Sequence, residues 1–436
     1  MALWYNWKVT IIYMGHITSK NYLNLQKRLD MNAQGAPASE SLYKILEILF
    51  TAEEAEKVSL LPIKSFSSSE AAKRWSLPIK ETEIILNELA SKGLLLDMEN
   101  QGIQTYVLAP TMAGFFEFAL MRTDGRFDRK VLSELFYHYI NEEDDFVEKA
   151  LMQKTPIART LVHEHAIQNK DQSEVLDYER ATHIINSATC ITVGTCYCRH
   201  KMEHVGKACA APQDVCLTFN TAAESLMKHK IAKQISKEEA RAVLDRCVNY
   251  GLVQIGDNIQ NQVNWMCNCC GCCCEAIQAY KKIGYRRKIN SNFFASVNRD
   301  KCVACGACVA KCPVDAIKII DKRAVVDEDI CIGCGICERS CGVKAITIER
   351  RKKLAMVPLD SFERCVINAI ETNKLQNYIF DNYNLWTNEL LRNLVGILFK
   401  LSPAKFLIAN RQLKSQFLRV LRKTKTSKIY KGLQKD

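Results

Sequence analysis

Residues 302–313 read CVACGACVAKCP, and residues 331–341 read CIGCGICERSC. In each run the first three cysteines are separated by two residues, and the fourth follows after three more. Thiolates this close together repel one another unless a cation neutralises them, so clustered free cysteines are typical of metal ligands. The two runs therefore predict metal binding by eight cysteines: Cys302, Cys305, Cys308, Cys312, Cys331, Cys334, Cys337 and Cys341.

The doubled motif resembles the bacterial two-cluster ferredoxins, and the resemblance covers residues 296–350. It implies a small (βαβ)2 fold that binds two [4Fe–4S] clusters and transfers single electrons. Pro313 follows the first motif as in that family, whereas Gly342 stands in its place after the second. By position, the resemblance implies one cluster on Cys302, Cys305, Cys308 and Cys341, and the other on Cys331, Cys334, Cys337 and Cys312.

A second group of cysteines precedes the ferredoxin-like motif in two bursts. Their close spacing also predicts a metal centre, and the C-x-C spacings favour one or more further iron–sulfur clusters over zinc. A zinc site with two thiolates from each burst, and dithiol/disulfide chemistry, remain open. The adjacent pairs are similar to the CCG modules of heterodisulfide-reductase-type proteins, but the spacing differs and no ligands are assigned from them. The candidate ligands are Cys196, Cys198, Cys209, Cys216, Cys267, Cys269, Cys270, Cys272, Cys273 and Cys274.

Other residues of the central region have two interpretations each. Four basic side chains among the cysteines are either donors to cluster sulfurs or solvated charges: Arg199, His200, His204 and Lys207. Two histidines at i and i+2 do not share a helix face, and we interpret them as surface or core residues rather than ligands: His163 and His165. Three isolated cysteines are interpreted as ordinary buried thiols: Cys190, Cys247 and Cys365.

The N-terminal part is expected to begin with an irregular leader over residues 1–40. Residues 41–110 show helical spacing, a Thr51–Glu54 capping box and two strands after Gly93, an order that resembles a winged-helix domain. A DNA-reading helix should be basic, but the helix expected from about Lys80 to Lys92 also carries Glu81, Glu83 and Glu88. The pattern therefore favours a protein-contact module over DNA binding.

Residues 111–290 are expected to be a helical, cysteine-rich domain, in which the aromatic residues at helical spacing form core and a Ser236–Glu239 capping box opens a helix. Residues 351–436 are expected to be a basic helical tail. The tail holds 17 Lys/Arg and 6 Asp/Glu, so it contributes +11 of the formal net charge of +12. Such a tail favours an anionic membrane surface or an acidic partner over nucleic acid, and a solvated, flexible tail is the alternative. Because the chain shows no apolar run of about 18 residues and no secretory leader, we expect a cytoplasmic protein, at most peripheral to a membrane.

The sequence thus predicts an α+β, mostly helical multidomain protein similar to the 4Fe–4S dicluster proteins of anaerobic prokaryotes. We expect an electron-transfer protein that relays single electrons between its two [4Fe–4S] clusters and a cysteine-rich centre or a partner oxidoreductase. Whether it is itself an enzyme stays open. The alternatives are a reductase whose catalytic centre is held by the central cysteines, and a redox-sensing winged-helix regulator.

Overall fold

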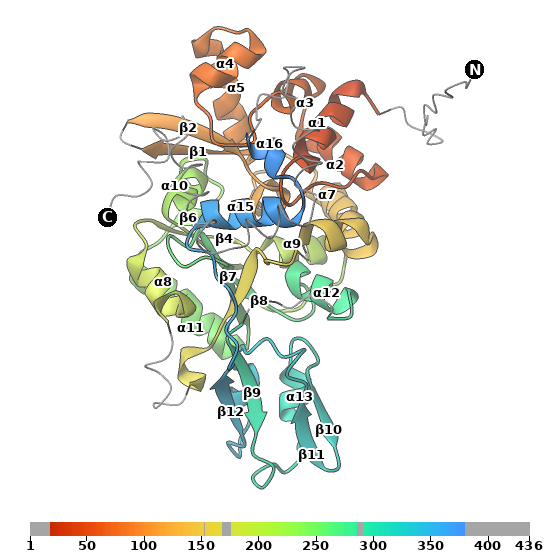
Figure 1. Cartoon of the computed structure of the whole chain (residues 1–436), viewed down its shortest axis with the longest axis vertical. Helices are drawn as coiled ribbons and strands as arrows, with labels where there is room; N and C mark the ends of the chain where they lie inside the picture. Colours follow the sequence, from red (N-terminus) through yellow and green to blue (C-terminus); the bar gives the residue numbers. More distant parts are fainter. Residues whose placement is uncertain are drawn as a thin grey trace, which may run out of the picture.

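The computed structural model describes residues 18–379, except 101, 152, 168–175, 286–288 and 290. A larger body combines helices with a six-stranded sheet, and a smaller module with β9, β12, α13, β10 and β11 projects from its lower end (Figure 1). The expectation of a mixed α+β protein is therefore correct.

Five helices form the N-terminal part of the body. The apolar spacing that predicts α2 is confirmed, since Leu42, Ile45 and Leu46 are fully buried. The Thr51–Glu54 capping box that opens α3 is also present. The helices are α1 (Lys20–Asp30), α2 (Glu40–Leu49), α3 (Ala52–Ser59), α4 (Ser68–Trp75) and α5 (Ile79–Ser91).

Helix α1 lies in the segment expected to be an irregular leader. Leu25 and Leu29 on this helix are buried, and α1 packs along α3. Residues 20–30 therefore belong to the folded body, because an amphipathic helix gains more by burying its apolar face than an extended leader would. The segment 1–17 lies outside the described residues.

An antiparallel hairpin, β1 (Leu95–Asn100) and β2 (Ile103–Leu108), follows α5. Phe66 adds a single antiparallel bridge to Tyr106 on β2. This order of helices and strands is the one expected, and the assignment as a winged helix stays a prediction.

The next segment is helical and supplies the aromatic part of the main core. Phe116 lies at its centre, with ring centroids 4.7 Å from Phe136 and 4.8 Å from Phe115. This confirms the interpretation of the aromatic residues as core. The elements are η1 (Thr111–Phe115), α6 (Phe116–Met121), α7 (Arg129–Phe136), η2 (Tyr137–Glu142) and η3 (Val147–Leu151).

The remainder of the cysteine-rich region was expected to be helical, and this expectation is wrong. The region is built on a sheet with strand order β3-β7-β8-β5-β4-β6. All neighbouring strands are antiparallel. The strands are short and β5 and β8 also contain cysteines, so the sheet lacks the long β-branched runs that identify strands in a sequence. They are β3 (Ala158–Leu161), β4 (Ile191–Thr195), β5 (Asp214–Phe219), β6 (Lys233–Gln234), β7 (Val253–Asp257) and β8 (Trp265–Cys269).

Helices connect these strands. The longest, α11, starts at the predicted Ser236–Glu239 capping box and ends at Gly251, whose left-handed φ of 84° closes the last turn. The helical elements are η4 (Glu164–Ala166), η6 (Asp177–Glu179), α8 (Ala181–Ser187), α9 (Tyr197–His204), α10 (Asn220–Lys228), α11 (Lys237–Tyr250) and α12 (Glu275–Lys282).

The smaller module has the internal repeat expected of residues 296–350. The first strand pairs with the last, β9 with β12, and the two middle strands β10 and β11 form a hairpin. Each motif has one short helix, which begins one residue before the third cysteine, Cys308 or Cys337. The elements are β9 (Phe293–Val297), α13 (Ala307–Lys311), β10 (Ile317–Ile320), β11 (Arg323–Val326), α14 (Ile336–Arg339) and β12 (Ile346–Arg350).

The chain then returns to the body with α15 (Ser361–Glu371) and α16 (Leu375–Ile379). Ala369 and Leu375 pack with Ala33 near the end of α1, and the Ala33 N–H donates to the Tyr378 hydroxyl at 3.0 Å. The first part of the expected basic tail is therefore integrated into the fold, while residues 380–436 lie outside the described residues. Within the described ranges, no helix combines the length and the hydropathy needed to cross a membrane.

Candidate iron–sulfur and metal centres

The structure brings together four cysteines that the family resemblance assigns to one cluster. Cys331, Cys334 and Cys337 line a small cavity of about 20 Å³ together with Cys312, the fourth cysteine of the other motif. The β10–β11 hairpin between the motifs returns the chain so that the second loop lies beside Cys312. The arrangement has the donor set of a cubane, four thiols around one enclosed space.

Backbone N–H groups point at the sulfurs of both motifs. Ala316 donates to Cys312 Sγ and Ala345 donates to Cys341 Sγ, each at 3.2 Å and each four residues after the cysteine. Ala324 donates to Cys302 Sγ at 3.4 Å. Such bonds stabilise the negative charge that thiolates and cluster sulfides carry, so these loops fit iron–sulfur clusters.

The two cluster loops differ in what covers them. Gly306 and Gly335 hold equivalent positions with left-handed φ angles of 77° and 91°. A Cβ on Gly306 would meet open space, whereas one on Gly335 would lie 2.9 Å from Ala166 Cβ and 3.2 Å from His163 Cβ. The second loop is therefore covered by the body, and the first is not. In agreement, Cys305 is exposed and Cys334 is buried.

His163 is a core residue, one of the two interpretations left open for it. Its backbone N–H donates to the Cys334 carbonyl at 3.0 Å, and its ring Nε2 lies 3.0 Å from the Leu252 carbonyl. Burial lowers the pKa of its imidazole to about 4. The residue therefore helps to hold the second loop against the body as a neutral side chain.

Six of the ten central cysteines surround a separate cavity of about 80 Å³ inside the body. Apolar side chains such as Met112, Ile255 and Trp265 complete its wall. Neighbouring thiols interact with one another in the order Cys196, Cys198, Cys274, Cys269, Cys267 and Cys216.

The sheet and two helix starts explain this gathering. Leu217 on β5 pairs with Met266 on β8, a register that places Cys216 opposite Cys267. Cys267 and Cys269 share one face of β8, since side chains alternate along a strand. Cys196 and Cys274 are the residues before α9 and α12, so both helices begin at the cavity.

Two of the six cavity cysteines, Cys274 and Cys196, favour the thiolate form, and both lie at helix starts. Hydrogen bonds from Cys198 and Cys269, supported by the N–H groups of Ile277 and Ala276, hold the pKa of Cys274 well below its usual range despite burial. A hydrogen bond from Cys198 and the charge of Arg199 lower the pKa of Cys196. Since the thiolate is the form that binds metal, the cavity has the chemistry of a soft-metal or cluster site.

A buried polar chain adjoins the cavity. The Tyr197 hydroxyl donates to one carboxylate oxygen of Glu275, and the Lys201 ammonium donates to the other. Lys201 also donates to the Asn141 side chain. Tyr197 itself lines the cavity, so the chain runs from the cavity wall to the ammonium group.

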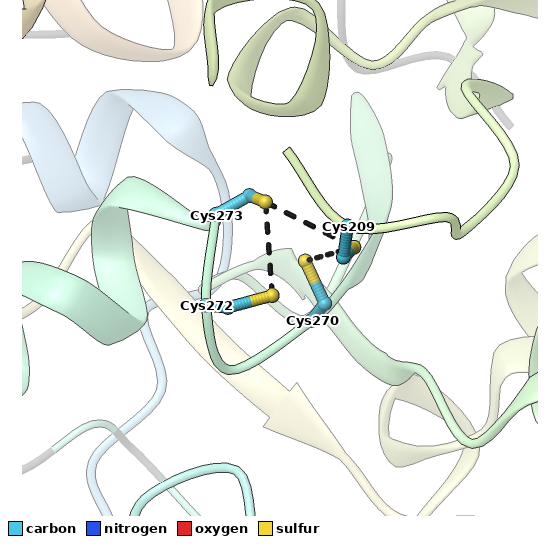
Figure 2. Close-up of side chains that lie close together, drawn as sticks. All are labelled: Cys209, Cys270, Cys272 and Cys273. Atoms are coloured by element: carbon cyan, nitrogen blue, oxygen red, sulfur yellow. Dashed lines mark hydrogen bonds between the residues drawn. The ribbon is translucent and has the colours of Figure 1, made fainter. Parts of the chain in front are cut away.

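The other four central cysteines form a second, compact group: Cys209, Cys270, Cys272 and Cys273 (Figure 2). Their sulfur atoms all lie within 4.8 Å of one another. Cys209 Sγ is 3.6 Å from Cys270 Sγ and 3.9 Å from Cys273 Sγ, and Cys272 Sγ is 3.7 Å from Cys273 Sγ.

Sequence reasoning grouped all ten cysteines together and missed this division. Two of the three adjacent pairs are split: Cys269 and Cys274 line the cavity, whereas their neighbours Cys270 and Cys273 join the compact group. The alternation of side chains along a strand could have separated Cys269 from Cys270, but only if β8 had been recognised as a strand. The compact group takes one cysteine from the first burst and three from the second, not two from each.

Of the four basic residues among the cysteines, Arg199 reaches a sulfur. Its Nη1 is 3.8 Å from Cys270 Sγ and also donates to the Asn268 carbonyl at 3.0 Å. His200 instead contacts the Leu120 carbonyl and His204, and Lys207 donates to the Tyr137 hydroxyl. Of the isolated cysteines, Cys190 and Cys247 are buried and Cys365 is half-buried. Cys247 packs in an apolar cluster that Cys196, Cys209 and Cys270 also contact, but it belongs to neither group of sulfurs.

Comparison with known families finds one match, in two segments. Residues 295–318 and 324–347 each match the 4Fe-4S binding domain, and these segments contain the eight cysteines of the two motifs. The comparison with curated proteins finds no match. The chain thus contains a tandem 4Fe-4S binding domain that carries two [4Fe–4S] clusters, and it is an iron–sulfur protein with an electron-transfer role.

Proposed function

We propose that the two [4Fe–4S] clusters exchange single electrons with a further iron–sulfur centre held by the six cysteines of the body cavity. The ferredoxin module would then connect that centre with an external redox partner. The exposed first loop, with Cys305 at the surface, is the side on which a partner can approach.

One observation carries this proposal: the two cysteine regions are in contact. Gly271, which lies between Cys270 and Cys272, packs on the backbone of Pro313, the residue after Cys312. A Cβ on Gly271 would lie 2.7 Å from the Pro313 carbonyl oxygen and 2.9 Å from its Cα. The loop that links both central cysteine groups therefore meets the chain beside a cluster cysteine.

Side-chain packing supports the same route. Cys269 and Cys274 from the cavity belong to one contiguous buried cluster with Cys312 and Cys334 of the module. Ile277, Tyr280, Val314 and Ile332 belong to the same apolar cluster. The Tyr280 hydroxyl also donates to the Ile330 carbonyl at 3.1 Å. Continuous packing between the two cysteine regions favours electron exchange between centres held in them.

The donor set supports a cluster in the cavity. One cubane needs four thiolates, and the cavity offers six, two of which are already favoured as thiolates. The additional thiols allow a cluster with more protein ligands than a cubane has.

Iron and sulfide analysis of anaerobically purified protein tests the proposal. Two cubanes alone give about 8 iron and about 8 sulfide per chain, and a further cluster raises both numbers, to about 12 for another cubane. We expect the higher values, and we expect Cys267→Ser/Cys269→Ser to return them to about 8. Cys190→Ser, which changes a buried thiol outside both groups, is the matched control. A wild-type content of about 8 iron and 8 sulfide contradicts a cavity cluster.

Electron paramagnetic resonance tests the exchange itself. In the fully reduced protein, paramagnetic centres that lie close together broaden and split each other's signals. We expect the ferredoxin signals to sharpen in Cys267→Ser/Cys269→Ser. Ferredoxin signals that are identical in the variant and the wild type contradict a close central redox centre.

A reductase is the second candidate, and the buried Tyr197–Glu275–Lys201 chain favours it. Tyr197 lines the cavity and is hydrogen-bonded to Glu275, so this chain would supply one of the two protons, and the clusters the two electrons, that reduce a disulfide to two thiols. Small disulfides should then reoxidise the reduced protein, and Tyr197→Phe should slow this without changing the iron content. Reoxidation at equal rates in both proteins contradicts this role for Tyr197.

A further inference from the structure

The spacing of the four sulfurs in the compact group is the spacing around one metal ion. Tetrahedral zinc–thiolate bonds of about 2.3 Å place the sulfur atoms roughly 3.8 Å apart. The contacts at 3.6, 3.7 and 3.9 Å between these sulfurs match that value without rearrangement. Figure 2 shows the four side chains converging on one point from two separate segments.

A cubane does not fit between the same sulfurs. It places four irons and four sulfides among its cysteine ligands and therefore holds them much further apart than one shared ion does. The six-cysteine cavity, by contrast, encloses about 80 Å³. The two central groups thus differ in arrangement: four sulfurs lie around one point in the compact group, whereas six thiols line a cavity in the other.

We propose that Cys209, Cys270, Cys272 and Cys273 bind one divalent metal ion, Zn²⁺ or Fe²⁺, in a tetrathiolate site without sulfide. Four protein ligands complete a tetrahedral shell and leave no position for a substrate, which is the arrangement of structural metal sites. The site is separate from the two [4Fe–4S] clusters and from the six-cysteine cavity, and it exists whether or not that cavity holds a cluster.

The charge around the site agrees with this assignment. Four thiolates and one divalent ion leave a net charge of −2, and the buried Arg199 guanidinium beside Cys270 offsets part of it. Arg199 is fixed in place, because both of its terminal nitrogens donate to the Asn268 carbonyl at 3.0 Å.

The ion would link two loops that lie next to the paired strands β5 and β8. Cys209 lies between α9 and β5, and the other three cysteines lie between β8 and α12. The second loop also carries Gly271, which rests on Pro313 of the ferredoxin module. The ion therefore positions the surface on which the module is seated.

Metal and sulfide analysis of the full-length protein, purified anaerobically, separates this proposal from the cavity cluster. We expect Cys272→Ser to lose one metal ion per chain and no sulfide, with the ferredoxin resonance signals retained. The element that is lost identifies the ion as zinc or iron. Cys190→Ser is the matched control and should keep every ion. Loss of several irons together with sulfide would show a cluster, and loss of no metal would show an empty site; either result overturns the proposal.

X-ray absorption of the wild-type protein tests the site without a variant, so that misfolding of Cys272→Ser cannot obscure the answer. For a zinc-loaded site, we expect four sulfur neighbours at about 2.3 Å and no second metal nearby. If iron occupies the site, Mössbauer spectroscopy should show one high-spin tetrahedral iron in addition to the clusters. Nitrogen or oxygen neighbours around zinc, or cluster iron alone, would refute the assignment.

Discussion

Lys201 and Glu275 form an ion pair in which the side chains are 0% and 1% exposed. Lys201 lies on α9 and Glu275 is the first residue of α12, so the pair ties together the two helices that begin at the six-cysteine cavity. Three cavity cysteines, Cys196, Cys198 and Cys274, lie at these helix starts. The pair therefore fixes the separation of sulfurs that no strand holds.

Lys201→Met should destabilise the protein by about 3–5 kcal/mol, because it leaves the Glu275 carboxylate buried without its counter-charge. The measurement is anaerobic urea unfolding of the full-length protein. Lys201→Met/Glu275→Gln should recover part of the loss. Lys44→Met, which breaks the exposed Lys44–Glu40 pair, should cost less than about 1 kcal/mol. Equal effects of the two lysine substitutions would refute the structural role of the buried pair.

Gly271→Ala should push the 270–273 loop away from the ferredoxin module, because the new Cβ would lie 2.7 Å from the Pro313 carbonyl oxygen. Overpacking of this kind costs about 1–3 kcal/mol. Hydrogen exchange near Pro313 should rise, while Gly342→Ala should leave it unchanged, since a Cβ there meets nothing within 4 Å. Unchanged exchange in Gly271→Ala would show that the two surfaces are not in contact in solution.

Gly306 and Gly335 provide a comparison within the repeat. Alanine at either position costs about 1–2 kcal/mol for the left-handed backbone. Gly335→Ala should cost about 1–3 kcal/mol more, because its Cβ collides with Ala166 and approaches His163. Thermal unfolding of the two variants measures the difference. If both lose the same stability, the second cluster loop is not covered by the body.

The part of this structure that the sequence predicts well is the part in which local rules suffice. Capping boxes such as Ser236–Glu239 fix a helix start from four residues, and α11 begins where they predict. The ligands of the two cysteine motifs can also be predicted from short segments, since each loop supplies three thiols. The pairing of Cys312 with the second loop came from family resemblance, and the structure brings that cysteine to the same cavity.

Strand β8 shows why the central sheet was missed: with cysteines at alternate positions, it lacks the apolar–polar alternation that identifies a strand. On β8, Trp265, Cys267 and Cys269 alternate with Met266 and Asn268. Asn268 is buried, and its amide donates to the Val215 carbonyl at 2.8 Å, so polarity does not mark an outer face here. Without the strand, nothing in the sequence separates Cys269 from Cys270. The division of the central cysteines into two groups therefore depends on the tertiary structure and cannot be read from their spacing in the sequence.

The carboxylate of Asp97 on β1 makes stability depend on pH in the acidic range. Its side chain is 1% exposed; burial raises its pKa, but hydrogen bonds from His229, Lys228 and Ser225 outweigh burial and hold the pKa below its usual value. A carboxyl with a depressed pKa in the folded state contributes stability that is fully present above the unfolded pKa of about 3.9. That contribution is lost as the pH falls through the lower folded pKa.

Asp97→Asn should therefore destabilise the protein by on the order of 3 kcal/mol near pH 7, because it removes the buried carboxylate that pairs with the Lys228 ammonium. The gap between wild type and variant should begin to narrow below about pH 4, because the carboxyl of the unfolded wild type then binds a proton while the folded carboxyl, whose pKa is lower, does not. Urea unfolding at pH 7, 5 and 3.5 measures this. Glu99→Gln, at an exposed position of the same strand, is the control and should change stability by less than about 0.5 kcal/mol. A gap that stays constant with pH would show that Asp97 is not charged in the folded protein.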